Sequence, residues 1–166
     1  LADHFFGGDG MMHGVRLEGG QAKWYRNRYI DTPAYRKEVG KFSPPTGENT
    51  TSAVSLIYHG GELMSLGEVG YPYLINPDDL STKGVFNYDG KLTGNMTAHP
   101  RIDPVTGELL FFGYNVMKPY LTYMRADAAG NMLQVEPIDL TGPSMIHDFA
   151  VTDNYVAFME MPVRFS

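Results

Sequence analysis

Turn signals rich in glycine, proline and asparagine divide this chain into short segments, and this feature constrains its fold most. The 166 residues include 19 glycines and 11 prolines, spread along the whole length, too many for a helical protein of this size. Short runs of β-branched and aromatic residues lie between the turns, at a spacing of roughly 8 to 12 residues that is typical of sandwiches, barrels and propellers. The sequence therefore predicts an all-β protein in which no helix exceeds one or two turns.

Eleven segments have the composition of strands, and paired glycines at 19–20 and 60–61 supply the positive φ that a tight hairpin needs. Eleven strands in 166 residues suit four-stranded sheets arranged around an axis, so the chain is expected to form two to three blades of a β-propeller. No repeat of roughly 40 residues is visible, so periodicity alone leaves a sandwich open. The predicted strands are 10–17, 22–31, 52–58, 62–67, 71–75, 95–98, 109–114, 119–126, 132–138, 145–151 and 154–160.

The two ends of the sequence also bear on its organisation. The chain begins on Leu1 rather than Met and stops at Ser166, with no polar tail at either end. Both ends are expected to be cuts inside a longer protein. Because a closed propeller has roughly four to eight blades, residues 1–166 are expected to be one incomplete domain that needs the rest of its propeller chain.

Composition excludes several classes of function. The net charge of −6 and the pI of about 5.2 argue against a nucleic-acid partner, because affinity for phosphates depends on clustered lysine and arginine. The chain has no cysteine, which excludes disulfides, thiolate nucleophiles and cysteine-based metal sites. Any metal must therefore be held by histidines and carboxylates.

Hydropathy bears on location. No apolar run approaches the roughly 18 residues that cross a bilayer, and the first residues lack the basic and apolar regions of a signal peptide. We expect a soluble protein, with the cytoplasm and a plastid both open as compartments.

Five histidines are available: His4, His13, His59, His99 and His147. His99 follows a strand-like segment and precedes Pro100, which restricts it to an extended backbone and fixes its direction. His147 lies in a mostly apolar run that predicts burial, and a buried imidazole needs a partner for each nitrogen. A metal on one nitrogen and an acceptor on the other would satisfy it. His4 and His59 are expected to be exposed, and His13 is expected to be structural.

Two segments resemble a known family. The sequences GNMTAHPRIDPVTGE (94–108) and MIHDFAVT (145–152) are similar to the segments that carry the first two ligands in carotenoid cleavage oxygenases, and FFGGDGMMH (5–13), YRNRY (25–29) and LGEVGYPY (66–73) resemble the early strands of that family. The resemblance implies a seven-bladed β-propeller with Fe(II) held on its axis by four histidines. It implies that His99 and His147 are iron ligands, and that Glu68 is the carboxylate accepting the N–H of His147.

The same resemblance implies a function. We expect a non-haem iron(II) dioxygenase that cleaves a carbon–carbon double bond of a carotenoid or apocarotenoid with O₂, giving two carbonyl products. The partners would be an apolar polyene and O₂, and a lipid-dissolved substrate implies peripheral contact with a membrane. Both remaining ligands of the family would lie outside residues 1–166, so the isolated chain is expected not to hold iron in the family manner.

Two alternatives stay open. The substrate could be a stilbene-type phenolic, although the stilbene cleavers of this family carry a lysine close before the glutamate matched to Glu68, where this chain has Gly67. The chain could instead be a non-catalytic β-propeller piece that binds apolar ligands without iron. The presence of two more histidines in strand-like settings further along the polypeptide would discriminate between these classes.

Overall fold

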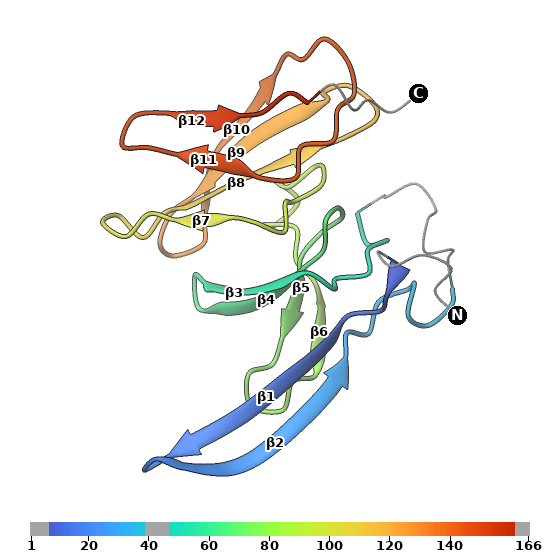
Figure 1. The fold of residues 1–166 in the computed structure, drawn as a ribbon, viewed down its shortest axis with the longest axis vertical. Coiled ribbons are helices and arrows are strands. Elements are labelled where there is room, and N and C mark those ends of the chain that lie inside the picture. Colours follow the sequence, from blue (N-terminus) through green and yellow to red (C-terminus); the bar gives the residue numbers. More distant parts are fainter. Residues whose placement is uncertain (1–6, 39–46, 162–166) are drawn as a thin grey trace.

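The computed structural model describes residues 7–38 and 47–161, which form short β-strands joined by turns (Figure 1). No α-helix occurs within these residues, so the all-β prediction is confirmed. Likewise, no helix in these two stretches is long and apolar enough to cross a membrane. The strands are β1 (Met11–Glu18), β2 (Gln21–Tyr29), β3 (Ser55–His59), β4 (Glu62–Leu66), β5 (Tyr73–Ile75), β6 (Thr82–Val85), β7 (Arg101–Ile102), β8 (Leu109–Tyr114), β9 (Leu121–Ala126), β10 (Met132–Ile138), β11 (Phe149–Val151) and β12 (Val156–Phe158).

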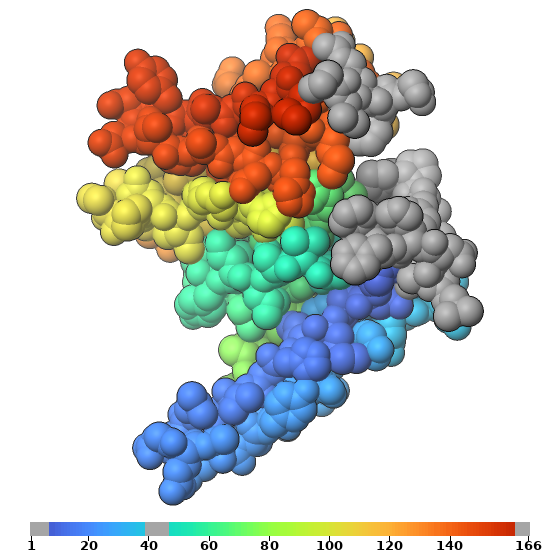
Figure 2. Space-filling view, in the orientation of Figure 1, coloured from blue at the N-terminus to red at the C-terminus, as the bar shows by residue number. Residues whose placement is uncertain are grey.

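The strands form four antiparallel sheets in which sequence neighbours pair. Two sheets have four strands, in the orders β3-β4-β5-β6 and β10-β9-β8-β7, and the other two are the hairpins β1-β2 and β11-β12. Figures 1 and 2 show the sheets following one another in sequence order from one end of the molecule to the other, with the β1–β2 hairpin projecting at one end.

Strand β8 lies at the centre of the packing because its sequence, LLFFGY, is apolar on both faces. Leu109 and Phe111 pack with Met64 and Leu66 of β4 in a core between the two four-stranded sheets. The alternate residues of β8, including Phe112, pack with Ile146, Phe149 and other residues of the following segment. A strand that is covered on both sides reads as a continuous apolar run rather than an alternating one.

Tight turns join the hairpins as the glycine pairs predict. Gly19 and Gly20 have φ of 57° and 76°, and Gly60 and Gly61 have φ of 58° and 83°. Consecutive positive φ values are the geometry of a two-residue turn whose twist matches that of the flanking strands. The end of the first hairpin near residues 12 and 30 packs on β5 through Met12, Ile30 and Ile75.

The predicted strand at 95–98 is wrong, and strands β6 and β7 were missed. Residues 95–98 form no ladder, because the segment is held by single bonds on two sides: Met96 N–H donates to Gly70 O at 3.0 Å, and Thr97 N–H donates to Phe112 O at 2.7 Å. The segment therefore bridges two sheets instead of joining one. The predicted strand at 145–151 is shorter than expected and begins only at Phe149.

Candidate metal centre

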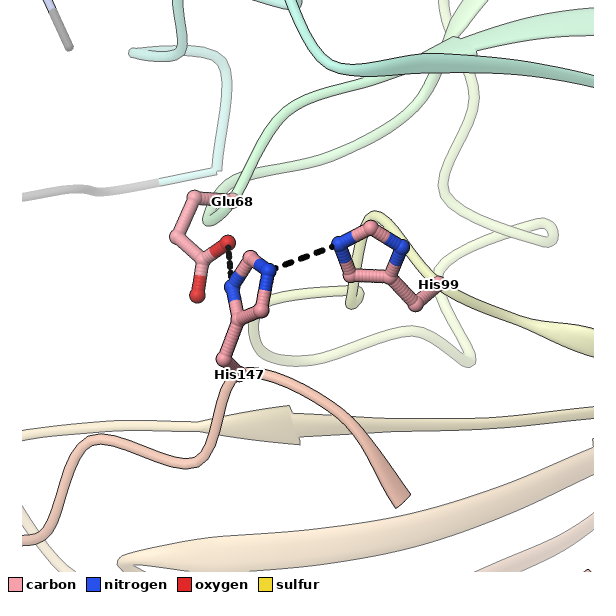
Figure 3. A group of neighbouring side chains, drawn as sticks. All are labelled: Glu68, His99 and His147. Carbon is pink, nitrogen blue, oxygen red and sulfur yellow. Dashed lines mark hydrogen bonds and ion pairs between the residues drawn. The ribbon is translucent and has the colours of Figure 1, made fainter. Parts of the chain in front are cut away.

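Three side chains from distant parts of the sequence point toward one another (Figure 3). His147 lies between the other two: its Nε2 is 3.0 Å from His99 Nε2, and its Nδ1 is 2.8 Å from Glu68 Oε2. One ligand atom from each of the three side chains lies within 4.8 Å of the others. The convergence expected of the two histidines is therefore present in the structure.

Glu68 determines which nitrogen of His147 carries the proton. A carboxylate can only accept, so Nδ1–H of His147 donates to Glu68. In the neutral ring, Nε2 is then left with a lone pair, and this lone pair is directed toward His99. A carboxylate in this position fixes the tautomer and orientation of a metal-ligating histidine and increases its basicity.

Tyr114 extends this chain of hydrogen bonds. Its hydroxyl, at the end of β8, donates to Glu68 Oε1 at 2.9 Å. Burial, the charge of Glu68 and this hydrogen bond together raise the pKa of Tyr114 well above its ordinary value, so the hydroxyl remains a donor. Sequence reasoning missed Tyr114, for which the only signal was that a tyrosine in an apolar strand needs a partner for its hydroxyl.

The facing Nε2 atoms could hold one metal ion between them. Two nitrogens 3.0 Å apart can each lie about 2.0 to 2.1 Å from a single ion, the usual distance for an imidazole ligand. Without a cation, the same contact is favourable only when one of the two Nε2 atoms carries a proton. Imidazole is a ligand type that suits iron among the first-row metals, so the donor set fits Fe(II).

Hydrogen bonds and the following proline hold the backbone of His99. The Thr97 hydroxyl accepts from His99 N–H at 3.1 Å, and the Ser55 hydroxyl of β3 donates to Ala98 O. Pro100 keeps the backbone of His99 extended. The bond from β3 explains how a residue outside any regular strand acquires a fixed direction.

His147 is anchored by its buried neighbours, but its own side chain is 58% exposed. Ile146 and Phe149 are buried in the core, whereas Met145 and His147 point the other way. The expectation that His147 is buried on both sides is therefore wrong. Successive side chains of this segment alternate in direction, so that Ile146 enters the core and His147 faces Glu68. The side chain of Glu68 is 28% exposed.

The other histidines lie apart from this group. His13 is exposed on β1, with Nδ1 2.6 Å from the hydroxyl of Tyr25 on β2, as expected of a structural residue. His59 is only 7% exposed, which corrects the expectation of a surface position. Its Nε2–H donates to Gly107 O at 2.9 Å, because the β3–β4 turn packs against the turns of the next sheet. His4 lies outside the described residues.

Comparison with known proteins identifies the family. A family model described as retinal pigment epithelial membrane protein matches residues 1–166. Carotenoid 9,10(9',10')-cleavage dioxygenase 1 of Arabidopsis thaliana is 38% identical over 98% of this chain. The chain spans 36% of the length of that relative, or about a third.

Solved structures agree with the sequence match. The lignostilbene dioxygenase of Pseudomonas brassicacearum is 31% identical, with a TM-score of 0.85 over 99% of this chain and 38% of its own. Cobalt-substituted apocarotenoid oxygenase of Synechocystis is 25% identical, with a TM-score of 0.79 over 95% of this chain and 39% of its own. Sequence and structure together show that the chain belongs to the retinal pigment epithelial membrane protein family, the family of the carotenoid cleavage oxygenases.

Proposed function

We propose that this chain carries half of the iron site of a non-haem iron(II) dioxygenase that cleaves a carbon–carbon double bond of a carotenoid or apocarotenoid with O₂. His99 and His147 would hold the iron through Nε2, and Glu68 would accept the Nδ1–H of His147. The observation that carries the proposal is the pair of Nε2 atoms facing each other at 3.0 Å, one of them oriented by a carboxylate. A relative that takes cobalt in place of its own metal supports a metal-dependent reaction.

The rest of the polypeptide completes the site in this proposal. The two four-stranded antiparallel sheets have the strand order of propeller blades, and the other blades of a seven-bladed ring would come from outside residues 1–166. Two further histidine ligands would come from those blades. The length of the relatives, about three times that of this chain, supports this division.

Iron bound at this site would supply a centre that activates O₂ beside the alkene. The protein's own residues bind and orient. Glu68 keeps the proton of His147 on Nδ1, and Tyr114 keeps Glu68 in place by donating to its second oxygen. Each oxygen of Glu68 thereby accepts one hydrogen bond, which orients the carboxylate toward His147. The overall reaction adds both atoms of O₂ across one broken C=C bond, giving two carbonyl products.

The residue before Glu68 favours a polyene over a stilbene-type phenolic. The stilbene cleavers resembled here carry a lysine close before this glutamate, and this chain has Gly67. A side chain at Gly67 would meet the Thr50 hydroxyl directly, and no lysine occurs anywhere in 62–70. The likeness to a lignostilbene dioxygenase supports the stilbene alternative. A polyene dissolved in lipid would be drawn from a membrane surface by peripheral contact.

Turnover by the full-length protein tests this proposal. The protein would be purified with Fe(II) and supplied with an apocarotenoid and, separately, with a hydroxylated stilbene, and the carbonyl products would be identified by mass spectrometry. We expect two carbonyl fragments from the apocarotenoid only. Cleavage of the stilbene alone would assign the protein to the phenolic class. If the protein takes up no Fe(II) and binds the polyene without cleaving it, the non-catalytic alternative would be supported.

Replacement of each histidine by alanine tests the ligand assignment. His99→Ala and His147→Ala should each remove most of the bound iron and all detectable cleavage, because each deletes a metal bond. His13→Ala is the matched control, since His13 is exposed and its ring contacts Tyr25 of the neighbouring strand. Full iron content in either site variant would contradict the assignment.

A further inference from the structure

Arg101 of β7 contacts both histidine-bearing segments. One of its terminal nitrogens, Nη1, donates to the main-chain oxygen of His99 at 3.0 Å. The other, Nη2, donates to both carboxylate oxygens of Asp148, at 2.8 and 2.9 Å. Asp148 directly follows His147 in sequence. The guanidinium of Arg101 therefore connects His99 to Asp148, the residue next to His147. His99 and His147 are the two residues that would supply the ligands.

The arrangement is held from further directions. Asp148 Oδ1 also accepts from the N–H of Phe149 at 2.8 Å, which fixes the carboxylate at the start of β11. The guanidinium carbon of Arg101 lies 5.8 Å from the centre of the Phe149 ring, within the range of a cation–π contact. Phe149 itself is buried against Phe112 of β8. Arg101 is thus seated on the core as well as on the two segments.

The segments need such a connection. Residues 94–100 and 145–148 belong to no strand of a sheet ladder, so no row of backbone hydrogen bonds fixes the distance between them. Exposed ion pairs contribute little to the free energy of unfolding, and the side chains of Arg101 and Asp148 are both well exposed. The chief consequence of this pair is therefore geometric rather than stabilising.

We infer that Arg101 is a positioning residue of the metal centre, acting through Asp148 and the main chain of His99 to hold the two Nε2 atoms at ligand separation. This inference rests on the proposed function. A lysine cannot replace the arginine, because its single ammonium nitrogen cannot reach the Asp148 carboxylate and the His99 carbonyl together, which the guanidinium contacts through two separate nitrogens. A positive charge alone is therefore insufficient to hold the two segments together, and the planar guanidinium with its two terminal nitrogens is required.

The test is Co(II) binding to the full-length protein, followed by the visible absorption of the bound ion. Arg101→Lys keeps the charge, so a change in affinity reports geometry. We expect the dissociation constant to rise about tenfold, at the lower end of the 10 to 100-fold range for residues that orient metal ligands, with an altered spectrum. Asp148→Asn, which weakens the same pair from the other side, should have a similar effect.

Arg125→Lys is the matched control. Arg125 contacts a carboxylate too, through Nε and Nη2 to Glu108 at 3.1 Å each, and its other hydrogen bond among the described side chains goes to Gln134, outside both histidine segments. The Arg125→Lys variant should leave the Co(II) affinity and the absorption spectrum unchanged. Its melting temperature should shift as little as that of Arg101→Lys. The double variant Arg101→Lys with Asp148→Asn should bind Co(II) no more weakly than the weaker single variant, because both changes break one contact.

The outcomes separate this inference from the proposed function. Wild-type affinity and spectrum in Arg101→Lys would overturn the role of Arg101 while leaving the metal site intact, and so would an equal loss in Arg125→Lys. If wild-type protein binds no Co(II), or if His99→Ala and His147→Ala bind it as wild type does, the proposed function fails and the inference fails with it.

Discussion

Glu68 and His147 are 79 positions apart in sequence and are joined by a hydrogen bond of 2.8 Å between Oε2 and Nδ1. The bond spans two sheets, because Glu68 follows β4 and His147 precedes β11. It orients the ring so that Nε2 faces His99. The positions of the three side chains depend on β8, which packs with β4 on one face and with the 144–149 segment on the other.

Glu68→Gln should damage the metal centre and leave the fold intact. The change is nearly isosteric, but a neutral amide accepts more weakly than a carboxylate and no longer supports the basicity of His147. We expect iron affinity or turnover of the full-length protein to fall about 10 to 100-fold, less than in His147→Ala. Iron content, turnover and melting temperature would be measured together. Full iron and full activity would reduce Glu68 to a structural role.

Tyr114→Phe should have a smaller effect in the same direction. The hydroxyl donates to Glu68 Oε1, and its loss removes one of the donors that hold the carboxylate. We expect about 1 kcal/mol less free energy of unfolding and an iron affinity between those of wild type and Glu68→Gln. Tyr123→Phe on β9 is the matched control, since Tyr123 is also a buried tyrosine of this sheet. Equal iron affinity in both variants would exclude a role for Tyr114.

Tyr88→Phe should stabilise the protein, whereas Tyr73→Phe should destabilise it. The Tyr88 hydroxyl is buried with no hydrogen-bond partner among the described residues, but the Tyr73 hydroxyl donates to Glu48 O at 2.9 Å. Removing a buried hydroxyl without a hydrogen bond should raise the free energy of unfolding by on the order of 1 kcal/mol, and removing a hydrogen-bonded hydroxyl should lower it by a similar amount. Chemical denaturation at pH 7 would measure both changes. A loss of stability in Tyr88→Phe would show that the hydroxyl has a partner.

The same tyrosines predict a fall in stability at alkaline pH. Burial raises the pKa of Tyr73 from 10.0 to about 12 and raises that of Tyr88 further. Above pH 10 the unfolded chain loses these protons while the folded chain keeps them. The unfolded state then binds fewer protons, so the free energy of unfolding decreases as pH rises. Unfolding measured between pH 8 and 11 should show this slope, and Tyr88→Phe should flatten it.

Gly113→Ala should disrupt the segment that leads to His99. A methyl group at Gly113 would overlap the main-chain oxygen of Asn95, whereas one at Gly94 would meet nothing within 4 Å. The backbone of 94–98 would have to move, which breaks the Thr97–Phe112 bond. We expect a loss of about 1 to 3 kcal/mol in the free energy of unfolding, as for other overpacked buried sites, together with reduced iron binding. Gly94→Ala should be tolerated, and equal tolerance of both would contradict the close approach.

Sequence patterns predict most of the strands but not all of their boundaries. The paired glycines located two hairpins, and the apolar run at 109–114 located the central strand, because turn chemistry and burial on both faces act locally. The segment at 95–98 was mistaken for a strand, since its composition is that of a strand and only its neighbours decide that it bridges two sheets. His59 was misplaced for a similar reason, because a turn sequence does not show which other turns pack against it.

The sequence by itself determined that the protein is all-β, that any metal ligand must be histidine or carboxylate, and which residues resemble those of an iron site. These conclusions follow from composition, local periodicity and short motifs. Only the tertiary structure decided that Glu68, His99 and His147 meet, that Tyr114 completes the hydrogen-bond chain, and that Arg101 joins the two histidine segments. The physical reason is that these contacts join residues 46 to 79 positions apart, whose distances depend on how the sheets stack.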